Sequence, residues 1–213
     1  MTTQPIRDPK TDRLLTPVNA ALLLIDYQPH ILSAVGSSDQ GLIVNNVVAL
    51  AKAAKLFGLP VVLSTVGVKM SGAQDILPEI QAVFPDISSI DRTMINAWED
   101  AEFRAAVTAT GRRKLIMGGL WTEVCLALPT LDALREGYQV YFVADAVGGL
   151  TPESHELALR RLIQTGAYPV TWAVVLSELQ RDHARQETEP GFKRILEEHA
   201  FRRGAPTRKR AAV

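Results

Sequence analysis

The stretch Ala20-Ala21-Leu22-Leu23-Leu24-Ile25-Asp26 decides the fold, because an unbroken apolar run ends on a carboxylate. A run that is apolar at every position has no polar face, so it predicts a strand that is buried on both sides. Strands of this kind occur in parallel sheets whose two faces are covered by helices. Asp26 is then expected at the carboxyl end of a central strand.

Short apolar runs alternate with segments of helical period along the rest of the chain. The predicted strands span 20–25, 60–65, 87–90, 114–118, 139–144 and 168–171. The predicted helices span 43–57, 77–83, 101–108, 122–136, 152–164, 173–181 and 191–201. Repeated strand and helix units predict an α/β protein with three αβα layers around a mostly parallel sheet of roughly six strands. The long excursion 66–89, with at most one short helix, is expected to serve function.

The length of 213 residues suits one domain, 1–213, since single α/β domains reach about 250 residues. We expect an N-terminal extension over 1–18, and a C-terminal helix with a basic tail over 190–213. The arginines and lysine of 202–210 are predicted to form a solvated tail, because basic blocks at chain ends are commonly disordered.

Charge and hydropathy argue against two classes of partner. With 23 basic and 23 acidic residues the chain has no net charge, so we expect no nucleic-acid partner. No apolar run approaches the ~20 residues that cross a bilayer, and the N-terminus has no apolar signal region, so no membrane partner is expected. The lone cysteine, Cys125, excludes an internal disulfide and fits a reducing cytoplasm.

Cys125 ends the segment Gly118-Gly119-Leu120-Trp121-Thr122-Glu123-Val124-Cys125, which follows a predicted strand. If Thr122 is the N-cap, Cys125 lies in the first helical turn, where free N–H groups favour a thiolate. The thiol is then expected to be acidic and nucleophilic, and the same N–H groups could stabilise an oxyanion. The alternative is a cysteine that acts as a small apolar core residue.

Asp26 and Cys125 are both expected at the carboxyl edge of the sheet, where ligands of doubly wound proteins bind. Asp26 could take the thiol proton and pass it to a leaving group, or it could only cap a loop. A thiolate beside a carboxylate needs a cation nearby. Arg92, which follows a predicted strand, is the candidate for that cation, although arginines most often form surface ion pairs.

Neither a metal nor a nucleotide cofactor is expected. The four histidines include no pair at metal-ligand spacing, and Gly118-Gly119 lacks the lysine of a phosphate loop and the third glycine of a dinucleotide fingerprint. A dyad of Cys125 with His30 or His155 stays open at this point.

Three segments resemble the isochorismatase-like cysteine hydrolase superfamily, and within it the YcaC-like subgroup. They are Leu22-Leu23-Leu24-Ile25-Asp26-Tyr27-Gln28, Ile95-Asn96-Ala97-Trp98 and the segment that ends at Cys125. The resemblance spans about 18–185 and implies an αβα fold with an Asp, Lys, Cys catalytic set. Cys125 would be the nucleophile and Asp26 the base and later the acid. Arg92 stands where a lysine is commonest, and it would stabilise the thiolate and orient Asp26.

The resemblance also implies a cis peptide between Leu120 and Trp121, and an oxyanion hole made by the N–H groups of Trp121 and Cys125. Ring-like homo-octamers are implied as well. Large aromatic residues fit the core or a subunit contact as well as a pocket. The predicted substrate-binding residues are Gln28, Asn96, Trp98, Leu120 and Trp121.

The leading hypothesis is a cofactor-independent hydrolase that cleaves a C–N bond of a small amide, carbamoyl or related acyl compound through a Cys125 thioester. The alternative is a homo-oligomeric protein that keeps the fold and uses the thiol for redox sensing or for nothing. A third reading, vinyl ether hydrolysis, predicts an activity that survives Cys125→Ala.

Overall fold

A six-stranded sheet in the order β3-β2-β1-β4-β5-β6 forms the centre of the computed structural model, which describes residue 8 and residues 11–200. Each pair of neighbouring strands is parallel. The strands are β1 Ala20–Ile25, β2 Val61–Val66, β3 Ile90–Arg92, β4 Lys114–Gly119, β5 Gln139–Val143 and β6 Tyr168–Val170. The predicted fold class is confirmed. The predicted basic tail and half of the predicted N-terminal extension lie outside the described residues.

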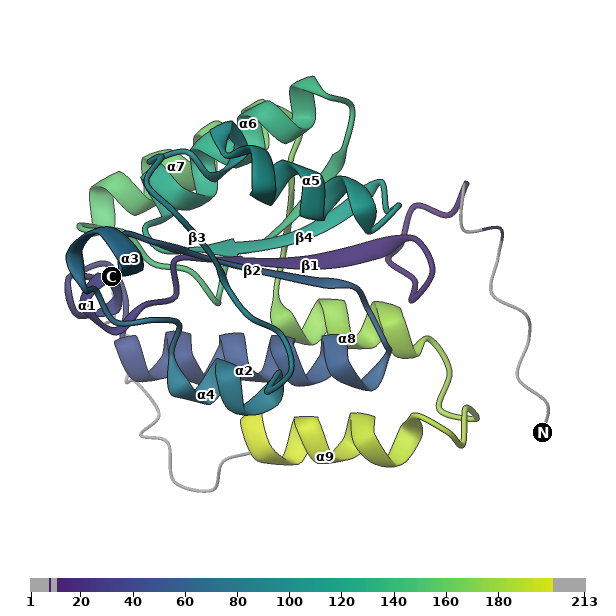
Figure 1. Ribbon diagram of the computed structural model, residues 1–213. Coiled ribbons are helices and arrows are strands. Elements are labelled where there is room, and N and C mark those ends of the chain that lie inside the picture. The colour runs from purple at the N-terminus through teal and green to yellow at the C-terminus, as the bar shows by residue number, and fades with distance from the viewer. Residues whose placement is uncertain (1–7, 9–10, 201–213) are drawn as a thin grey trace, which may run out of the picture.

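Helices cover both faces of the sheet, and shorter ones lie beyond the carboxyl ends of the strands (Figure 1). One face carries α2 Gln40–Leu56, α4 Pro78–Val83 and α8 Trp172–Gln180, and α9 Glu189–His199 packs on the outside of α2 and α8. The other carries α5 Ala101–Ala109, α6 Ala127–Arg135 and α7 Pro152–Gln164. The short elements are α1 Pro29–Ser33, α3 Val68–Ser71, the 3-10 turn η1 Ala97–Glu99 and the π-helical turn η2 Thr122–Leu126.

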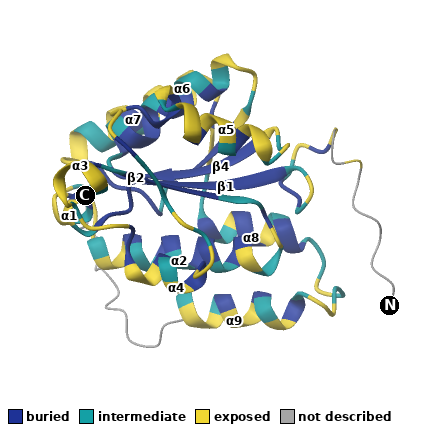
Figure 2. Ribbon diagram, viewed as in Figure 1, coloured by how far each residue is buried: buried dark blue, intermediate teal, exposed yellow. Residues whose placement is uncertain are grey.

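Strand β1 is apolar at every position because it contributes to two cores at once. Ala20, Leu22 and Leu24 belong to the core under α2 and α8, whereas alternate residues such as Leu23 and Ile25 belong to the core under α5 and α6. Every residue of β1 is buried, and Figure 2 shows the central strands as the most buried part of the sheet. Burial of both faces is the pattern that the sequence predicts for this strand.

Besides shifts of one to three residues at element ends and the unpredicted short elements α1 and η1, the structure differs from the sequence-based boundaries in three places. The predicted helix 122–136 is divided into η2 and α6. The strand predicted at 87–90 lies instead at Ile90–Arg92. The prediction is displaced because a three-residue edge strand with two charged residues shows no apolar pattern. The excursion 66–89 contains two helices, α3 and α4, and α3 has only four residues, too few to show a helical period.

The chain reverses direction across the sheet at β1. It runs from β1 to β2 and β3 on one side, and then returns to β4 on the other side of β1. Ile25 at the end of β1 is paired with Gly119 at the end of β4. The residues that follow these two strands therefore meet at a topological switch point, where open α/β sheets bind ligands.

Candidate active site

Asp26 occupies the first position after β1 and has a left-handed backbone, with φ of 59°. Its N–H donates to the carbonyl of Ser64 at 2.9 Å, so the backbone stays attached to β2 while the chain turns. A non-glycine residue in this region carries backbone strain, which clusters at functional sites. Its side chain is fully buried beneath the carboxyl edge of the sheet.

Arg92, the last residue of β3, reaches past β2 to Asp26. Its Nη1 and Nη2 donate to the two carboxylate oxygens at 2.6 and 2.7 Å, the parallel fork that arginine forms with carboxylates. Nη1 also donates to the Thr65 carbonyl at 3.0 Å, and Nη2 to the Ile95 carbonyl at 3.2 Å. Burial opposes the charged guanidinium, but the hydrogen bonds and charge of Asp26 raise the pKa of Arg92. The interpretation of Arg92 as a surface pair is wrong.

The helix that carries Cys125 begins at Thr122 as predicted, but its N-cap is the residue before and not Thr122. Trp121 is its N-cap, and a cis peptide joins Leu120 to Trp121. Thr122 lies inside the first turn, and its hydroxyl hydrogen-bonds to Nδ1 of His155 at 2.8 Å instead of capping the helix. Gly119 passes so close to the backbone of Cys125 that an added Cβ would lie 3.1–3.2 Å from backbone atoms of the helix.

Cys125 is 7% exposed, so its thiol is buried together with the Asp26 carboxylate. Burial raises the pKa of Cys125, and the charge and hydrogen bond of Asp26 raise it further. The Arg92 charge and a hydrogen bond from the backbone N–H of Trp121 lower it, without reversing the shift. The predicted acidic thiol is therefore wrong, because burial and a carboxylate outweigh the helix end.

The predicted substrate-binding residues fall into two groups by exposure. Trp121 is half-buried, and the other four are buried. The Gln28 side chain is bonded to backbone, since its Oε1 accepts from Val66 N–H at 2.9 Å and its Nε2 donates to the Gln74 carbonyl at 2.8 Å. Asn96 caps η1 by accepting from Trp98 N–H at 3.0 Å.

Trp98 is buried between two aromatic rings, and its Nε1 donates to Glu136 at 3.0 Å. Leu120 is fully buried, whereas Trp121 is half-buried and donates from Nε1 to the Ile31 carbonyl at 2.9 Å. Trp121 is thus the only member of the predicted set that the described structure leaves partly open to solvent.

Sequence reasoning missed two polar residues of the site, Ser64 and Glu123. Ser64 accepts a hydrogen bond from Arg92 Nη1 at 3.3 Å, and a serine inside an apolar strand is the signal that could have found it. Glu123 accepts hydrogen bonds from Leu150 N–H and Ser154 Oγ, both at 2.9 Å. The open dyad of Cys125 with a histidine finds no support from His155, whose Nδ1 pairs with the Thr122 hydroxyl.

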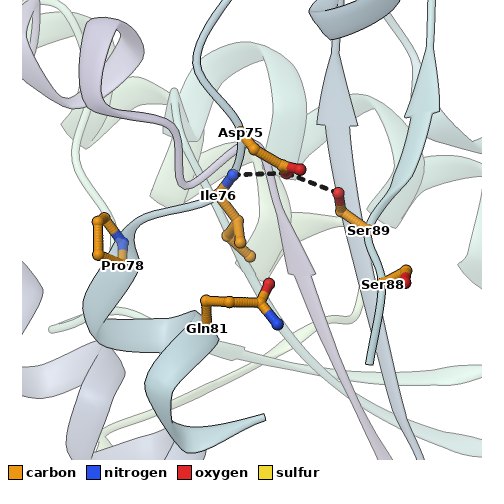
Figure 3. A pocket seen from close by; sticks show the side chains of 6 residues that line it. All are labelled: Asp75, Ile76, Pro78, Gln81, Ser88 and Ser89. Carbon is orange, nitrogen blue, oxygen red and sulfur yellow. Dashed lines mark hydrogen bonds between the residues drawn. The ribbon is translucent and has the colours of Figure 1, made fainter. Parts of the chain in front are cut away.

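A cavity of about 530 Å³, lined by polar and apolar side chains, lies in the connection between β2 and β3 (Figure 3). Asp75 at its rim accepts hydrogen bonds from Ser89 Oγ and from the N–H of Ile76, each at 2.7 Å. None of the catalytic candidates lines it. Among residues 8 and 11–200, no cluster of three or more histidine, cysteine or acidic side chains could hold a metal ion, and no helix there is long and apolar enough to cross a membrane.

An αβα fold with a buried aspartate, arginine and cysteine at the switch point of the sheet defines the class of site. The chain belongs to the isochorismatase family of hydrolases, because the profile of the isochorismatase domain matches residues 20–174. It is 42% identical to "Probable hydrolase YcaC" of Escherichia coli over 165 residues, 77% of this chain and 79% of that protein. The predicted resemblance is confirmed.

Two solved structures are similar over most of their length. YcaC from Pseudomonas aeruginosa, in complex with hexane-2,5-diol and covalent acrylamide, has a TM-score of 0.83 and 38% identity, covering 89% of this chain and 93% of that one. YcaC of E. coli, described as an octameric hydrolase of unknown specificity, has a TM-score of 0.83 and 37% identity, covering 92% and 93%. The nicotinamidase of Bacillus subtilis, at 19% identity and a TM-score of 0.62, shares the fold alone.

Proposed function

We propose that the chain is a cofactor-independent cysteine hydrolase that cleaves a C–N bond of a small amide, carbamoyl or related acyl compound. The observation that carries the proposal is the buried Asp26 carboxylate, whose two oxygens Arg92 holds and whose charge raises the pKa of the Cys125 thiol. A neutral thiol beside a fixed carboxylate is the starting state for general-base activation of a nucleophile. The covalent acrylamide in the P. aeruginosa protein indicates a nucleophile in that relative, since acrylamide reacts with nucleophiles at its vinyl carbon and not at its amide.

In the first half of the reaction, Asp26 takes the proton of Cys125 while the sulfur attacks the carbonyl carbon of the substrate. The N–H groups of Trp121 and Cys125 receive the negative charge that forms on the carbonyl oxygen. Protonated Asp26 then gives its proton to the leaving nitrogen as the C–N bond breaks. The amine departs and a thioester remains on Cys125.

In the second half, the Asp26 carboxylate takes a proton from water, and the resulting hydroxide attacks the thioester carbon. The C–S bond breaks, the acid product leaves, and the proton returns from Asp26 to the sulfur. Arg92 gives up no proton, because a guanidinium stays charged in proteins. Its part is to hold Asp26 and to stabilise the transient thiolate.

The half-buried Trp121 ring, next to the buried Leu120, is proposed to contact substrate. We propose that Gln28, Asn96 and Trp98 support the site without touching substrate. Their polar atoms already hydrogen-bond to backbone groups or to neighbouring side chains. We further propose a cytoplasmic homo-oligomer, as the octameric E. coli relative suggests. Redox sensing fits the site less well, since sensor cysteines are accessible and have low pKa values.

The test compares the unmodified chain with Cys125→Ala and with Arg160→Ala, which removes an exposed side chain that pairs with Glu156 on α7. A panel of small amides, carbamoyl compounds and ureas is screened for ammonia or amine release, with intact mass measured for an acyl adduct. Turnover and adduct are expected to vanish in Cys125→Ala and to persist in Arg160→Ala. Turnover that survives Cys125→Ala would refute the thioester mechanism and favour vinyl-ether-type chemistry.

A further inference from the structure

The carboxylate of Glu123 lies two residues before the nucleophile and takes no part in the proposed proton transfers. Its Oε1 accepts from the N–H of Leu150 and from Oγ of Ser154, both at 2.9 Å. Ser154 belongs to the first turn of α7, where Thr151 and Ser154 form a capping box. One oxygen atom therefore connects the first turn of the nucleophile helix η2 to a separate loop and to a separate helix.

A second contact runs beside the first. Thr122 Oγ1 lies 2.8 Å from Nδ1 of His155, so consecutive residues of η2 contact consecutive residues of α7. The Thr122 N–H also donates to the Gly148 carbonyl at 3.0 Å, and Leu120 forms a bridge with Gly148. The turn at 148–150 is thus attached to both sides of Trp121, the N-cap of the nucleophile helix.

The turn fits closely against the carboxylate. A Cβ on Gly149 would overlap Oε2 of Glu123 and would lie 3.0 Å from Cβ of His155. Oε2 is buried and has no hydrogen-bond partner among the described residues, so it fills space against Gly149. Only glycine at position 149 leaves room for the Glu123 carboxylate where it lies.

We propose that Glu123 is a positioning residue for the nucleophile: its carboxylate holds the 148–150 turn and the start of α7 against η2, and so fixes Cys125 beside Asp26. The inference rests on the proposed function, since it assigns the fixed geometry to a reacting thiol. The charged groups around that thiol are Asp26 from the end of β1 and Arg92 from β3, with Glu123 and His155 in the adjoining contacts.

The test uses iodoacetamide, because Cys125 is the sole cysteine of the chain and one mass shift reports on it alone. The alkylation rate constant is measured against pH for the full chain and for Glu123→Ala, Glu123→Gln and the exposed neighbour Glu153→Ala. Without the two hydrogen bonds to Oε1, Cys125 becomes less buried and separates from Asp26, so the inflection of Glu123→Ala is expected to fall by about one pH unit. Glu123→Gln keeps an accepting Oε1 and is expected to follow the unmodified chain, as is Glu153→Ala.

Gly149→Ala disturbs the same contact from the side of the glycine. It takes the place of Glu123→Ala in the test if that variant does not fold. It is expected to displace the carboxylate and to lower the inflection of the alkylation rate against pH by about as much as Glu123→Ala does. In a Glu123→Ala background it is expected to add no further change. A folded Glu123→Ala with an unchanged inflection, or a Gly149→Ala effect that persists in full without Glu123, would overturn the proposal. Alkylation needs no hydrolytic turnover, so this result is independent of whether the chain cleaves amides.

Discussion

Arg92 and Asp26 form a two-point hydrogen-bonded pair, Nη1 to Oδ1 at 2.6 Å and Nη2 to Oδ2 at 2.7 Å, in which both side chains are fully buried. Removing one partner leaves the other charge buried and alone. Arg92→Ala is therefore expected to lower the free energy of unfolding in urea by about 3–5 kcal/mol. Arg92→Lys keeps the charge but loses the fork, so a smaller loss is expected.

The control for that measurement is Arg135→Ala. Arg135 pairs with Asp132 at 3.0 Å, but its side chain is 77% exposed. Exposed pairs contribute about 0–1 kcal/mol, so the two arginine variants should differ clearly. Equal losses in both would show that the pair with Asp26 contributes no more than a surface contact.

Asp26→Asn is expected to change thiol reactivity and turnover in opposite directions. The Asp26 charge and hydrogen bond raise the pKa of Cys125, so their removal lowers it and leaves Arg92 to favour the thiolate. Alkylation near neutral pH should become faster, while hydrolysis is lost because no base remains. The measurement pairs the pH dependence of iodoacetamide labelling with turnover, and slower labelling in Asp26→Asn would contradict the assigned contact.

Asn96 is expected to matter for stability and not for substrate affinity. Its side chain accepts from Trp98 N–H at 3.0 Å and donates to Asp132 at 2.7 Å. Asn96→Ala should cost about 0.5–2 kcal/mol of unfolding free energy, the usual effect of losing a cap, with KM unchanged. Trp121→Ala is the contrasting variant, expected to raise KM, and an equal rise in both would place Asn96 in the pocket.

Gly118→Ala tests the close approach of β4 to Tyr27. An added Cβ would overlap the Tyr27 hydroxyl, which donates to the Ala146 carbonyl at 2.7 Å. Overpacking of a buried site costs about 1–3 kcal/mol, measured here as a lower midpoint in urea. The cost should shrink when Gly118→Ala is made in a Tyr27→Phe background, and an undiminished cost would point to a different clash.

The sequence predicts the sheet well where burial leaves a simple pattern. The run 20–25 reads as a central strand because both of its faces are covered, and the edge rule for parallel strands predicts that Asp26 and Cys125 meet. The strand of Arg92 is predicted too early in the chain, since its neighbour Asp91 is charged and the edge strand has only three residues. The place of Arg92 along the chain makes it a candidate, but the fork to Asp26 depends on tertiary structure and could not be foreseen.

The reactivity of the thiol shows a different limit of sequence reasoning. A position in the first turn of a helix predicts a lowered pKa, yet the pKa of Cys125 is raised. The decisive influences are burial and the Asp26 carboxylate, and both depend on tertiary distances that no local motif encodes. The same holds for Gln28, whose amide completes the backbone hydrogen bonding of Val66 and Gln74.

The catalytic candidates lie at the ends of strands and not in the connection between β2 and β3, and this separation affects how the fold can diversify. Asp26, Arg92 and Cys125 each follow or end a different strand, while α3, α4 and the cavity of Figure 3 belong to the connection between β2 and β3. Substitutions in that connection can reshape the surroundings of the sheet edge and leave the reacting atoms where the strands hold them. A lineage with this arrangement is able to accumulate substitutions in a surface segment while the three side chains at the strand ends stay in place.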